Sequence, residues 1–208
     1  MDNKTDNNIE NKELFQCTGC GDCCHFREEK KLGVKDEQNY KNYMYKNFGI
    51  IYLADLSNIT ISIFPEEAEI LNKIAKERKI KMLIKPKRAI YTKENNLVIM
   101  DYFIDHDVCP FFDEKTKRCT VYEYRPLICR SYPLTSTKSY GKCKYKKLKF
   151  EEYGEEMEYA KKLESLINKQ KSIISEMMKN NELFLENIDE KKFQEIVNSN
   201  IKELRIMK

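Results

Sequence analysis

The sequence predicts an α+β protein: a small, irregular cysteine-cluster domain with a strand and hairpin element, followed by a helical C-terminal extension. Three observations predict this class. Four of the eight cysteines lie within residues 17–24, strand-like patterns fall between residues 59 and 104, and apolar residues recur at helical spacing after residue 150. We therefore divide the chain into a disordered leader, residues 1–13, a cysteine-cluster domain, residues 14–150, and a helical extension, residues 151–208.

The leader indicates where the protein works. Residues 1–13 are polar and rich in asparagine, so they favour disorder and lack the apolar core of a signal peptide. No segment approaches the roughly 18–20 apolar residues that cross a membrane. We expect a cytoplasmic protein with no membrane partner. Because the cytoplasm is reducing, the cysteines are more typical of metal ligands or redox groups than of structural disulfides.

The region between the two cysteine groups carries the expected strands and one helix. Ile59–Ile63 alternates with the period of a half-buried strand. A helix is expected to begin at Phe64–Glu67, because proline suits a first helical turn and the helix dipole stabilises acidic residues there. The apolar stretches Ala89–Thr92 and Leu97–Ile104 flank a short polar turn and predict a β-hairpin. The apolar face of the helix is formed by Ala68, Leu71, Ile74 and Ala75.

Two helices are predicted after residue 150. The second begins near Asp189. The two helices either cover the cysteine domain or pair with a second copy of the chain, and we favour packing within the chain. The first has an apolar stripe, interrupted by Gln170, of Ala160, Leu163, Ile167, Ile174 and Met177. The buried face of the second is expected to contain Phe193, Ile196, Val197, Ile201 and Leu204.

The first cysteine group has the spacing of a metal site. Cys17, Cys20 and Cys23 can each turn a sulfur toward one ion or cluster, as in ferredoxin-type Cys-x-x-Cys-x-x-Cys runs. Glycines at 19 and 21 permit the tight backbone of such a loop. Thiolates suit soft metals, so we predict zinc or iron, with a 4Fe-4S cluster as one form of the iron. Such a metal would stabilise a chain in which only 41% of the residues are hydrophobic.

The other thiols leave alternatives open. A fourth ligand must come from elsewhere in the chain, for example Cys109. The side chain of Cys24 leaves the backbone in another direction from that of Cys23, so Cys24 serves a second metal, bridges two metals or stays free for chemistry. Eight thiols could fill two four-sulfur sites. The candidate metal ligands are Cys17, Cys20, Cys23, Cys24, Cys109, Cys119, Cys129 and Cys143.

Cations and histidines lie next to these cysteines in the sequence. Four thiolates around Zn²⁺ carry a net charge of −2, which nearby cations would compensate. His25 follows Cys24, and His106 precedes Cys109 by three residues, so each could replace a cysteine as a ligand. The alternative is a solvent-facing loop residue for His25 and a hairpin end for His106, and we favour it in both cases. The flanking cations are Arg118, Arg125, Arg130, Lys142 and Lys144.

The sequence gives little support to phosphate binding, to serine–histidine–acid catalysis or to nucleic-acid binding. No glycine-rich phosphate loop is present, and two histidines leave no serine–histidine–acid set to single out. The stretch Lys138–Lys149 carries six lysines with Tyr140 and Tyr145 interleaved, which could hold a nucleic-acid backbone. A solvated loop is the more common reading of such a charge run, and the net charge is only +4. We therefore do not expect nucleic acid as a partner.

Four motifs together resemble a known family. The combination, which spans about residues 15–145, is similar to the YkgJ family of cysteine-cluster proteins, described as a zinc- or iron-chelating domain. The resemblance implies metal chelation by the first seven cysteines, with Cys143 as a further ligand. The motifs are Cys17-x-x-Cys20-x-x-Cys23-Cys24, Cys109-Pro110-Phe111-Phe112, Cys119-Thr120-Val121-Tyr122 and Arg125-Pro126-x-x-Cys129-Arg130-x-Tyr132-Pro133.

Three functions follow as hypotheses. The first is a protein that chelates zinc or iron, where zinc gives a closed structural site and an iron–sulfur cluster allows electron transfer. The second is a protein-modifying enzyme, because flagellin lysine N-methylases share similar cysteine motifs; it predicts binding of a methyl donor. The third is a zinc-stabilised interaction or nucleic-acid module. Neither the protein partner or substrate nor the oligomeric state follows from the sequence.

Overall fold

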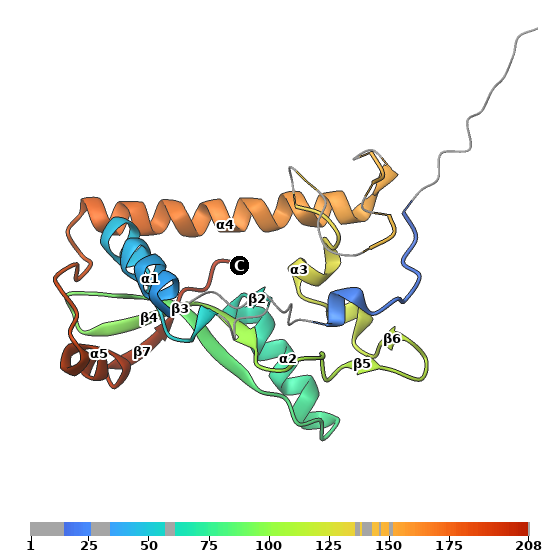
Figure 1. Ribbon diagram of the computed structural model, residues 1–208, viewed down its shortest axis with the longest axis horizontal. Helices are drawn as coiled ribbons and strands as arrows, with labels where there is room; N and C mark the ends of the chain where they lie inside the picture. The colour runs from blue at the N-terminus through green and yellow to red at the C-terminus, as the bar shows by residue number, and fades with distance from the viewer. Residues whose placement is uncertain are drawn as a thin grey trace, which may run out of the picture.

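A mixed sheet lies at one end of the molecule, and the cysteine-bearing loops lie at the other, in the computed structural model (Figure 1). The described residues are 15–25, 34–56, 61–135, 138, 143–145, 147–149 and 152–207. The expected disordered leader lies outside them. The elements are η1 (Asp22–Cys24), α1 (Val34–Phe48), β1 (Ile51–Tyr52), β2 (Ser62–Ile63), α2 (Pro65–Glu77), β3 (Ile84–Tyr91), β4 (Asn96–Ile104), β5 (Phe112–Asp113), β6 (Arg118–Cys119), η3 (Tyr122–Tyr124), α3 (Leu127–Arg130), α4 (Glu155–Lys179), α5 (Glu190–Val197) and β7 (Asn200–Glu203).

The α+β class is confirmed, and the sheet is built around the predicted hairpin. Strands β3 and β4 pair antiparallel, with β1 next to β3 and β2 next to β4. The turn closes with Asn95 at φ 59°, a left-handed conformation that asparagine tolerates. Of the strand expected at Ile59–Ile63, the structure forms β2; residues 59 and 60 lie outside the described part of the chain.

Helix α2 begins where the sequence predicts and joins the sheet to the cysteine loops. Its four predicted apolar residues are buried. They form one core with Ile104 at the end of β4 and with Phe111 and Val121 from the cysteine segment. Cys109 and Cys119 pack against this core. The loops that carry these two cysteines are therefore fixed by apolar burial against α2.

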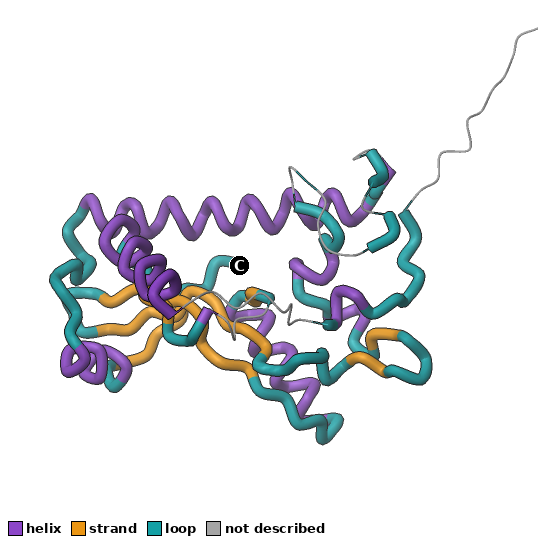
Figure 2. The backbone as a smooth tube through the Cα atoms, viewed as in Figure 1, coloured by secondary structure: helices purple, strands orange, loops and turns teal. Residues whose placement is uncertain are grey.

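Helix α4 runs along one side of the molecule, from α1 at the sheet end to α3 at the cysteine end (Figures 1 and 2). Gln170, which interrupts its apolar stripe, is almost fully buried and donates to the carbonyl of Met100 at 2.8 Å. This bond satisfies the amide inside the core, so the polar residue does not end the helix. None of the described helices combines the length and the apolar character that crossing a membrane requires.

The end of the chain corrects one prediction. Helix α5 stops at Val197, and residues 200–203 form β7, which pairs in parallel with the first half of β4. The prediction that Ile201 and Leu204 lie on the buried face of this helix is wrong; Ile201 is 62% exposed. The backbone groups of β4 at residues 96–99 need partners, and strand pairing provides them. The division of the chain at residue 150 stays a prediction.

Candidate metal centre

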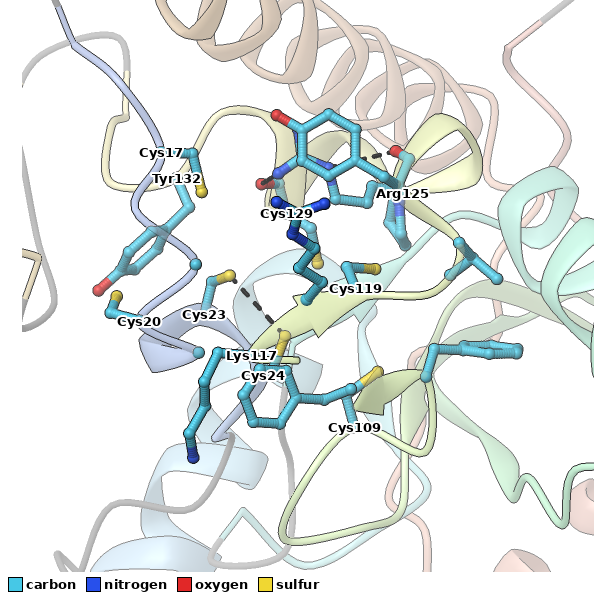
Figure 3. A pocket seen from close by; sticks show the side chains of 18 of the residues that line it. Cys17, Cys20, Cys23, Cys24, Cys109, Lys117, Cys119, Arg125, Cys129 and Tyr132 are labelled. Carbon is cyan, nitrogen blue, oxygen red and sulfur yellow. Dashed lines mark hydrogen bonds between the residues drawn. The ribbon is translucent and has the colours of Figure 1, made fainter. Parts of the chain in front are cut away.

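All eight cysteines line one cavity of about 680 Å³ (Figure 3). They come from three separate parts of the chain. Four lie in the loop that ends in η1, three lie in the segment from residue 109 to helix α3, and one lies at residue 143. The rest of the wall is mostly apolar, with aromatic side chains such as Phe111 and Phe112. Its charged members are Lys117, Arg118, Arg125 and Glu156. The distant sulfurs therefore do fold back onto the early loop.

The two glycines of the first cysteine group allow a close approach between that loop and the β5–β6 hairpin. Gly19 and Gly21 both have positive φ, 66° and 79°. A Cβ on Gly19 would lie 2.6 Å from the carbonyl oxygen of Lys117, and one on Gly21 would lie 2.4 Å from the Phe112 ring. Neither distance leaves room for a methyl group. The glycines are thus needed for contact with Lys117 and Phe112 of the hairpin that carries Cys119, as well as for the turn.

Backbone hydrogen bonds fix Cys24 next to Cys109. The N–H of Cys109 donates to the carbonyl of Cys24 at 2.8 Å, and His25 forms a β-bridge with Val108. These two cysteines, 85 positions apart by their numbers, share one short piece of sheet-like pairing. The early loop is therefore attached to the later cysteine segment by its backbone, independently of any bound metal.

Cys23 and Cys24 lie closer than the sequence suggested. Their Sγ atoms are 4.0 Å apart (Figure 3). Two sulfurs on one tetrahedral zinc, at about 2.3 Å each, would be separated by roughly 3.8 Å. The expectation that these neighbouring thiols diverge is wrong, because residues 22–24 form a 3₁₀ turn after the left-handed Gly21. Both sulfurs can thus serve one centre.

Five thiols interact with one another, and we call Cys23, Cys24, Cys109, Cys119 and Cys129 the inner set. The hydrogen bond from Cys24 lowers the pKa of Cys23 to about 7, and the same bond, together with burial, raises the pKa of Cys24. Burial raises the pKa of Cys109 to about 11, and burial and the charges of Cys23, Cys109 and Cys119 raise that of Cys129 strongly. The inner set cannot ionise together without a compensating cation, and a bound metal ion is such a cation.

The other three thiols form an outer set, Cys17, Cys20 and Cys143. Cys17 and Cys20 are exposed, while Cys143 is buried. Burial raises the pKa of Cys143, and the charges of Cys20, Asp22 and Cys17 add to this effect. Figure 3 shows Cys17 and Cys20 on the same loop, on either side of the Tyr132 ring and away from Cys109.

Arg125 is the predicted cation that faces the inner set. Its guanidinium lies 3.7 Å from the centre of the Tyr122 ring, and its Nε donates to the Tyr122 carbonyl at 3.3 Å. The charge of Arg125 favours the thiolates of Cys23, Cys119 and Cys129. Stacking on an aromatic face suits arginine and holds the charge in place beside the sulfurs.

The other predicted cations have different surroundings. Arg130 donates to the carbonyls of Glu123 and Arg125 and to the hydroxyl of Tyr159, so it ties the cysteine segment to α4. Lys144 lies 4.6 Å from the centre of the Tyr145 ring. Arg118 lines the cavity but is exposed. Lys142 lies outside the described residues.

Glu67 positions Cys129, a role that sequence reasoning missed. Its carboxylate accepts hydrogen bonds from the N–H of Phe64 at 2.9 Å and from the N–H of Leu127 at 2.7 Å. Leu127 begins helix α3, which carries Cys129. Burial raises the pKa of Glu67. The acidic first turn of α2 is visible in the sequence, but its second partner is 60 residues away, and no local pattern reveals it.

Both histidines are engaged with the backbone. The Nδ1 of His25 is 2.7 Å from the carbonyl oxygen of Gly21, and the Nε2 of His106 accepts from the N–H of Leu83 at 3.0 Å. Neither ring lines the cavity. We therefore leave both histidines out of the proposed ligand set.

As the side chains stand, no three His, Cys, Asp or Glu residues in the described part of the chain are arranged to hold a metal ion. The cysteine donors nevertheless fit zinc or iron by their chemistry, because both metals are bound by thiolates in proteins. Bringing three or more sulfurs onto one ion requires rotation about the Cα–Cβ bonds between staggered positions.

Comparison with known proteins identifies the family. Residues 16–159 match the family model "CxxCxxCC: Putative zinc- or iron-chelating domain". This match covers the four motifs, both cysteine groups and the start of α4, which is more than half of the chain. No curated protein and no solved structure matches the chain. The chain belongs to the CxxCxxCC family of zinc- or iron-chelating domains.

Proposed function

We propose that this protein binds zinc or iron through cysteine thiolates at the cavity, and that the inner set forms the principal centre. The observation that carries the proposal is the gathering of all eight cysteines on the wall of one cavity. Three thiols of the inner set come from a segment that begins 85 positions after Cys24. Free cysteines placed at random on a fold of this size would not all meet, whereas soft-metal ligands must.

Charge compensation supports the same centre. Four thiolates on one dication leave two negative charges in a largely apolar wall. Arg125 supplies one positive charge beside Cys23, Cys119 and Cys129. Within the described part of the chain, Arg125 forms no ion pair with a carboxylate, although its charge also acts on the carboxyl group of Glu156.

The finer proposal is an iron–sulfur cluster in the inner set. The number of sulfurs in the inner set exceeds the four that a single structural zinc takes, and a four-iron cluster is held by four cysteine thiolates. When bound, such a cluster would supply electron transfer. The chain itself supplies the thiolates, the Arg125 charge and the apolar wall that limits solvent access.

The test is anaerobic purification followed by elemental analysis, labile sulfide assay and a visible absorption spectrum. We expect zinc or iron in stoichiometric amount, with sulfide and visible absorption if the cluster is present. C119S should lose much of this metal, because serine does not replace a thiolate. T18V is the matched control, since Thr18 lines the same cavity without a thiol and the change preserves its shape. A folded preparation without bound metal would contradict the proposal.

The size of the cavity favours a second candidate, a metal-dependent protein-modifying enzyme. About 680 Å³ falls within the roughly 300–1,000 Å³ typical of small-molecule sites, and its wall carries the carboxyl group of Glu156 together with the cations of Lys117, Arg118 and Arg125. This candidate predicts that a methyl donor such as S-adenosylmethionine binds the metal-loaded protein. Calorimetry without a binding signal would remove its support.

The nucleic-acid candidate gains nothing from the lysine-rich stretch. Tyr145, one of its two aromatic residues, packs edge-on against Phe15 with ring centres 5.4 Å apart, so its ring is engaged inside the protein. Stacking on bases requires a free aromatic face. Neutralising the lysines in residues 138–149 is therefore expected to leave any affinity for RNA unchanged in an electrophoretic mobility assay.

A further inference from the structure

We propose that Lys87, in the sheet, is a modification site whose amine accepts the acyl group of a small acyl phosphate. The groups that form the site are the side chains of Lys87, Ser62, Arg88 and Asp101, on strands β2, β3 and β4 and at the end of β2 nearest to them. None of these residues lines the cysteine cavity. The inference therefore goes beyond the proposed function and does not depend on it.

An irregularity in the pairing of β3 with β4 determines the place of Lys87. Its neighbours Pro86 and Arg88 are both paired with residues of β4, whereas Lys87 has no partner in the register. Such a bulge redirects a side chain from the regular alternation of a strand. The carbonyl of Lys87 accepts from the N–H of Leu53 at 3.0 Å, so the backbone of the bulge is held in place.

The amine of Lys87 is bound to a hydroxyl group. Its Nζ donates to the Oγ of Ser62 at 2.5 Å. Because β2 and β3 lie on opposite sides of β4, the lysine side chain crosses the middle strand to reach this partner. The side chain is only partly exposed, and no carboxylate of the described residues forms an ion pair with it. A neutral hydroxyl stabilises an ammonium less than a carboxylate does, so the lost solvation is not fully compensated.

The neighbouring charges also favour a neutral amine. Arg88 forms a bidentate pair with Asp101, so these two charges balance, and a protonated Lys87 leaves one positive charge in excess. The charge of Asp101 favours the Lys87 ammonium, but that of Arg88 disfavours it, and burial has the largest effect and lowers the pKa of Lys87 to about 8. At about pH 7.5, roughly one Lys87 in four is then neutral, against roughly one in a thousand for a lysine of the ordinary pKa of 10.5.

A neutral amine in a desolvated site is an activated nucleophile. Its lone pair attacks the carbonyl carbon of the acyl phosphate and forms a C–N bond. The bond from that carbon to the phosphate oxygen breaks, and phosphate leaves with the electron pair. The nitrogen releases one proton to water, so the products are a neutral amide and free phosphate, with no oxidation or reduction.

The charge of the site favours an anionic donor. Before the reaction, the excess positive charge of Lys87 and Arg88 over Asp101 attracts a phosphate-bearing reagent. After the reaction, the amide carries no charge, and only the balanced Arg88–Asp101 pair remains. Acylation therefore removes the one charge in this cluster that lacks a carboxylate partner among the described residues.

The test incubates the purified protein with acetyl phosphate at about pH 7.5 and follows acetylation at each lysine by mass spectrometry of chymotryptic peptides. Lys85 is the matched control in the same molecule, because it lies on the same strand but is half exposed and paired with Asp105 at 2.6 Å. We expect Lys87 to react about tenfold faster than Lys85, since the larger neutral fraction outweighs the lower nucleophilicity of a weaker base. The rate at Lys87 should level off above about pH 8.

Both lysines are measured in the wild type, so the result does not depend on the folding of a variant. A Lys87 that reacts no faster than Lys85 would overturn the modification site. Acetic anhydride, a neutral donor, should give a smaller preference for Lys87, and an equal preference would overturn the assignment of an anionic donor. Metal content does not enter this experiment, so its failure leaves the proposed function standing.

Discussion

The interiors of the sheet end and the cysteine end of this molecule are filled in different ways. At the sheet end, β3 and β4 bury Ala89, Ile90 and Ile99 completely, and apolar side chains fill the interior. At the cysteine end, loops surround a cavity of about 680 Å³ whose polar members are mainly thiols. Apolar packing stabilises the first end by itself. The second end lacks that filling, so its stability should depend on what the thiols bind.

The two ends also differ in the partners of their arginine side chains. In the sheet, Arg88 and Asp101 form a buried, bidentate pair, with Arg88 donating to both carboxylate oxygens. At the cysteine end, the charge of Arg125 acts on the thiols of Cys23, Cys119 and Cys129 and on the carboxyl group of Glu156. The Arg88–Asp101 pair is therefore neutral by itself, while the charges of the cysteine end are balanced when thiolates and a metal are both present. Four predictions test this contrast, and the largest effect comes first.

Metal removal should unfold the cysteine end and spare the sheet. Structural zinc contributes roughly 10–16 kcal/mol to the folding of small domains, which exceeds any single side-chain effect here. After treatment with a chelator, we expect amide hydrogen exchange to accelerate at residues 15–25 and 109–130. Exchange at residues 84–104 should stay slow. Mass spectrometry of peptic fragments measures both regions in one sample, and equal acceleration in both would refute the contrast.

Breaking the Arg88–Asp101 ion pair should lower the stability of the sheet and leave the metal content unchanged. In D101N, Arg88 loses a buried anionic partner, and leaving one buried charge unpaired costs about 3–5 kcal/mol. Asp101 is 1% exposed, so water cannot replace the carboxylate. We expect a clear drop in the urea midpoint of unfolding with unchanged metal per chain. D101N protein that loses its metal while still folded would show that the two ends are coupled.

Adding a methyl group at Gly21 should lower the metal content of the protein. In G21A, the new Cβ collides with the Phe112 ring, and φ of 79° adds backbone strain, together about 1–3 kcal/mol. The collision pushes the loop of Cys20 and Cys23 away from the hairpin of Cys119. G154A is the matched control, because Gly154 also has positive φ but nothing within 4 Å of its Cβ position.

We expect both variants to lose stability and only G21A to lose metal, as measured by elemental analysis. Equal metal content in G21A and G154A would mean that the contact with Phe112 does not position the thiols.

Sequence patterns predicted the helices and strands that are stabilised by residues of the same segment. The hairpin, α2 and α4 follow from periodicity and capping residues within each segment. Strand β7 was missed because its stability comes from pairing with β4, about a hundred positions earlier. Helix α1 was missed as well; its tyrosines Tyr40 and Tyr43 remain exposed, so it lacks a strong apolar stripe.

The candidate site, too, could be predicted only in part from the sequence. The cysteines were all visible in the sequence, because their number and the close spacing of the first four are typical of ligands to a soft metal. Their position on the wall of one cavity was not visible, since it depends on contacts between distant segments, such as that of Phe15 with Tyr145. Arg125 and Arg130 were equivalent in the sequence. Only the fold turns one toward the sulfurs and the other toward Tyr159.

The smallest expected effect is a pH dependence that belongs to the sheet end. Lys87 on β3 is largely buried, and its ammonium donates to the hydroxyl of Ser62 at 2.5 Å. Burial lowers the pKa of Lys87 to about 8, from an ordinary value of 10.5. Between these two values the unfolded chain binds more protons than the folded one. Stability should therefore rise with pH across this window, by at most about 1.4 kcal/mol per pH unit.

K87M removes the titrating group and should flatten this rise, because a thioether suits the buried position and carries no charge. K85M is the matched control, since Lys85 lies on the same strand but is half exposed and paired with Asp105 at 2.6 Å. Urea unfolding at several pH values between 7 and 10.5 measures the slopes. Because metal binding by thiols also varies with pH, the comparison is made between the two variants at equal metal content. Equal slopes in K87M and K85M would show that the Lys87 ammonium is not held in a desolvated site, and that the sheet end is less completely closed than its packing indicates.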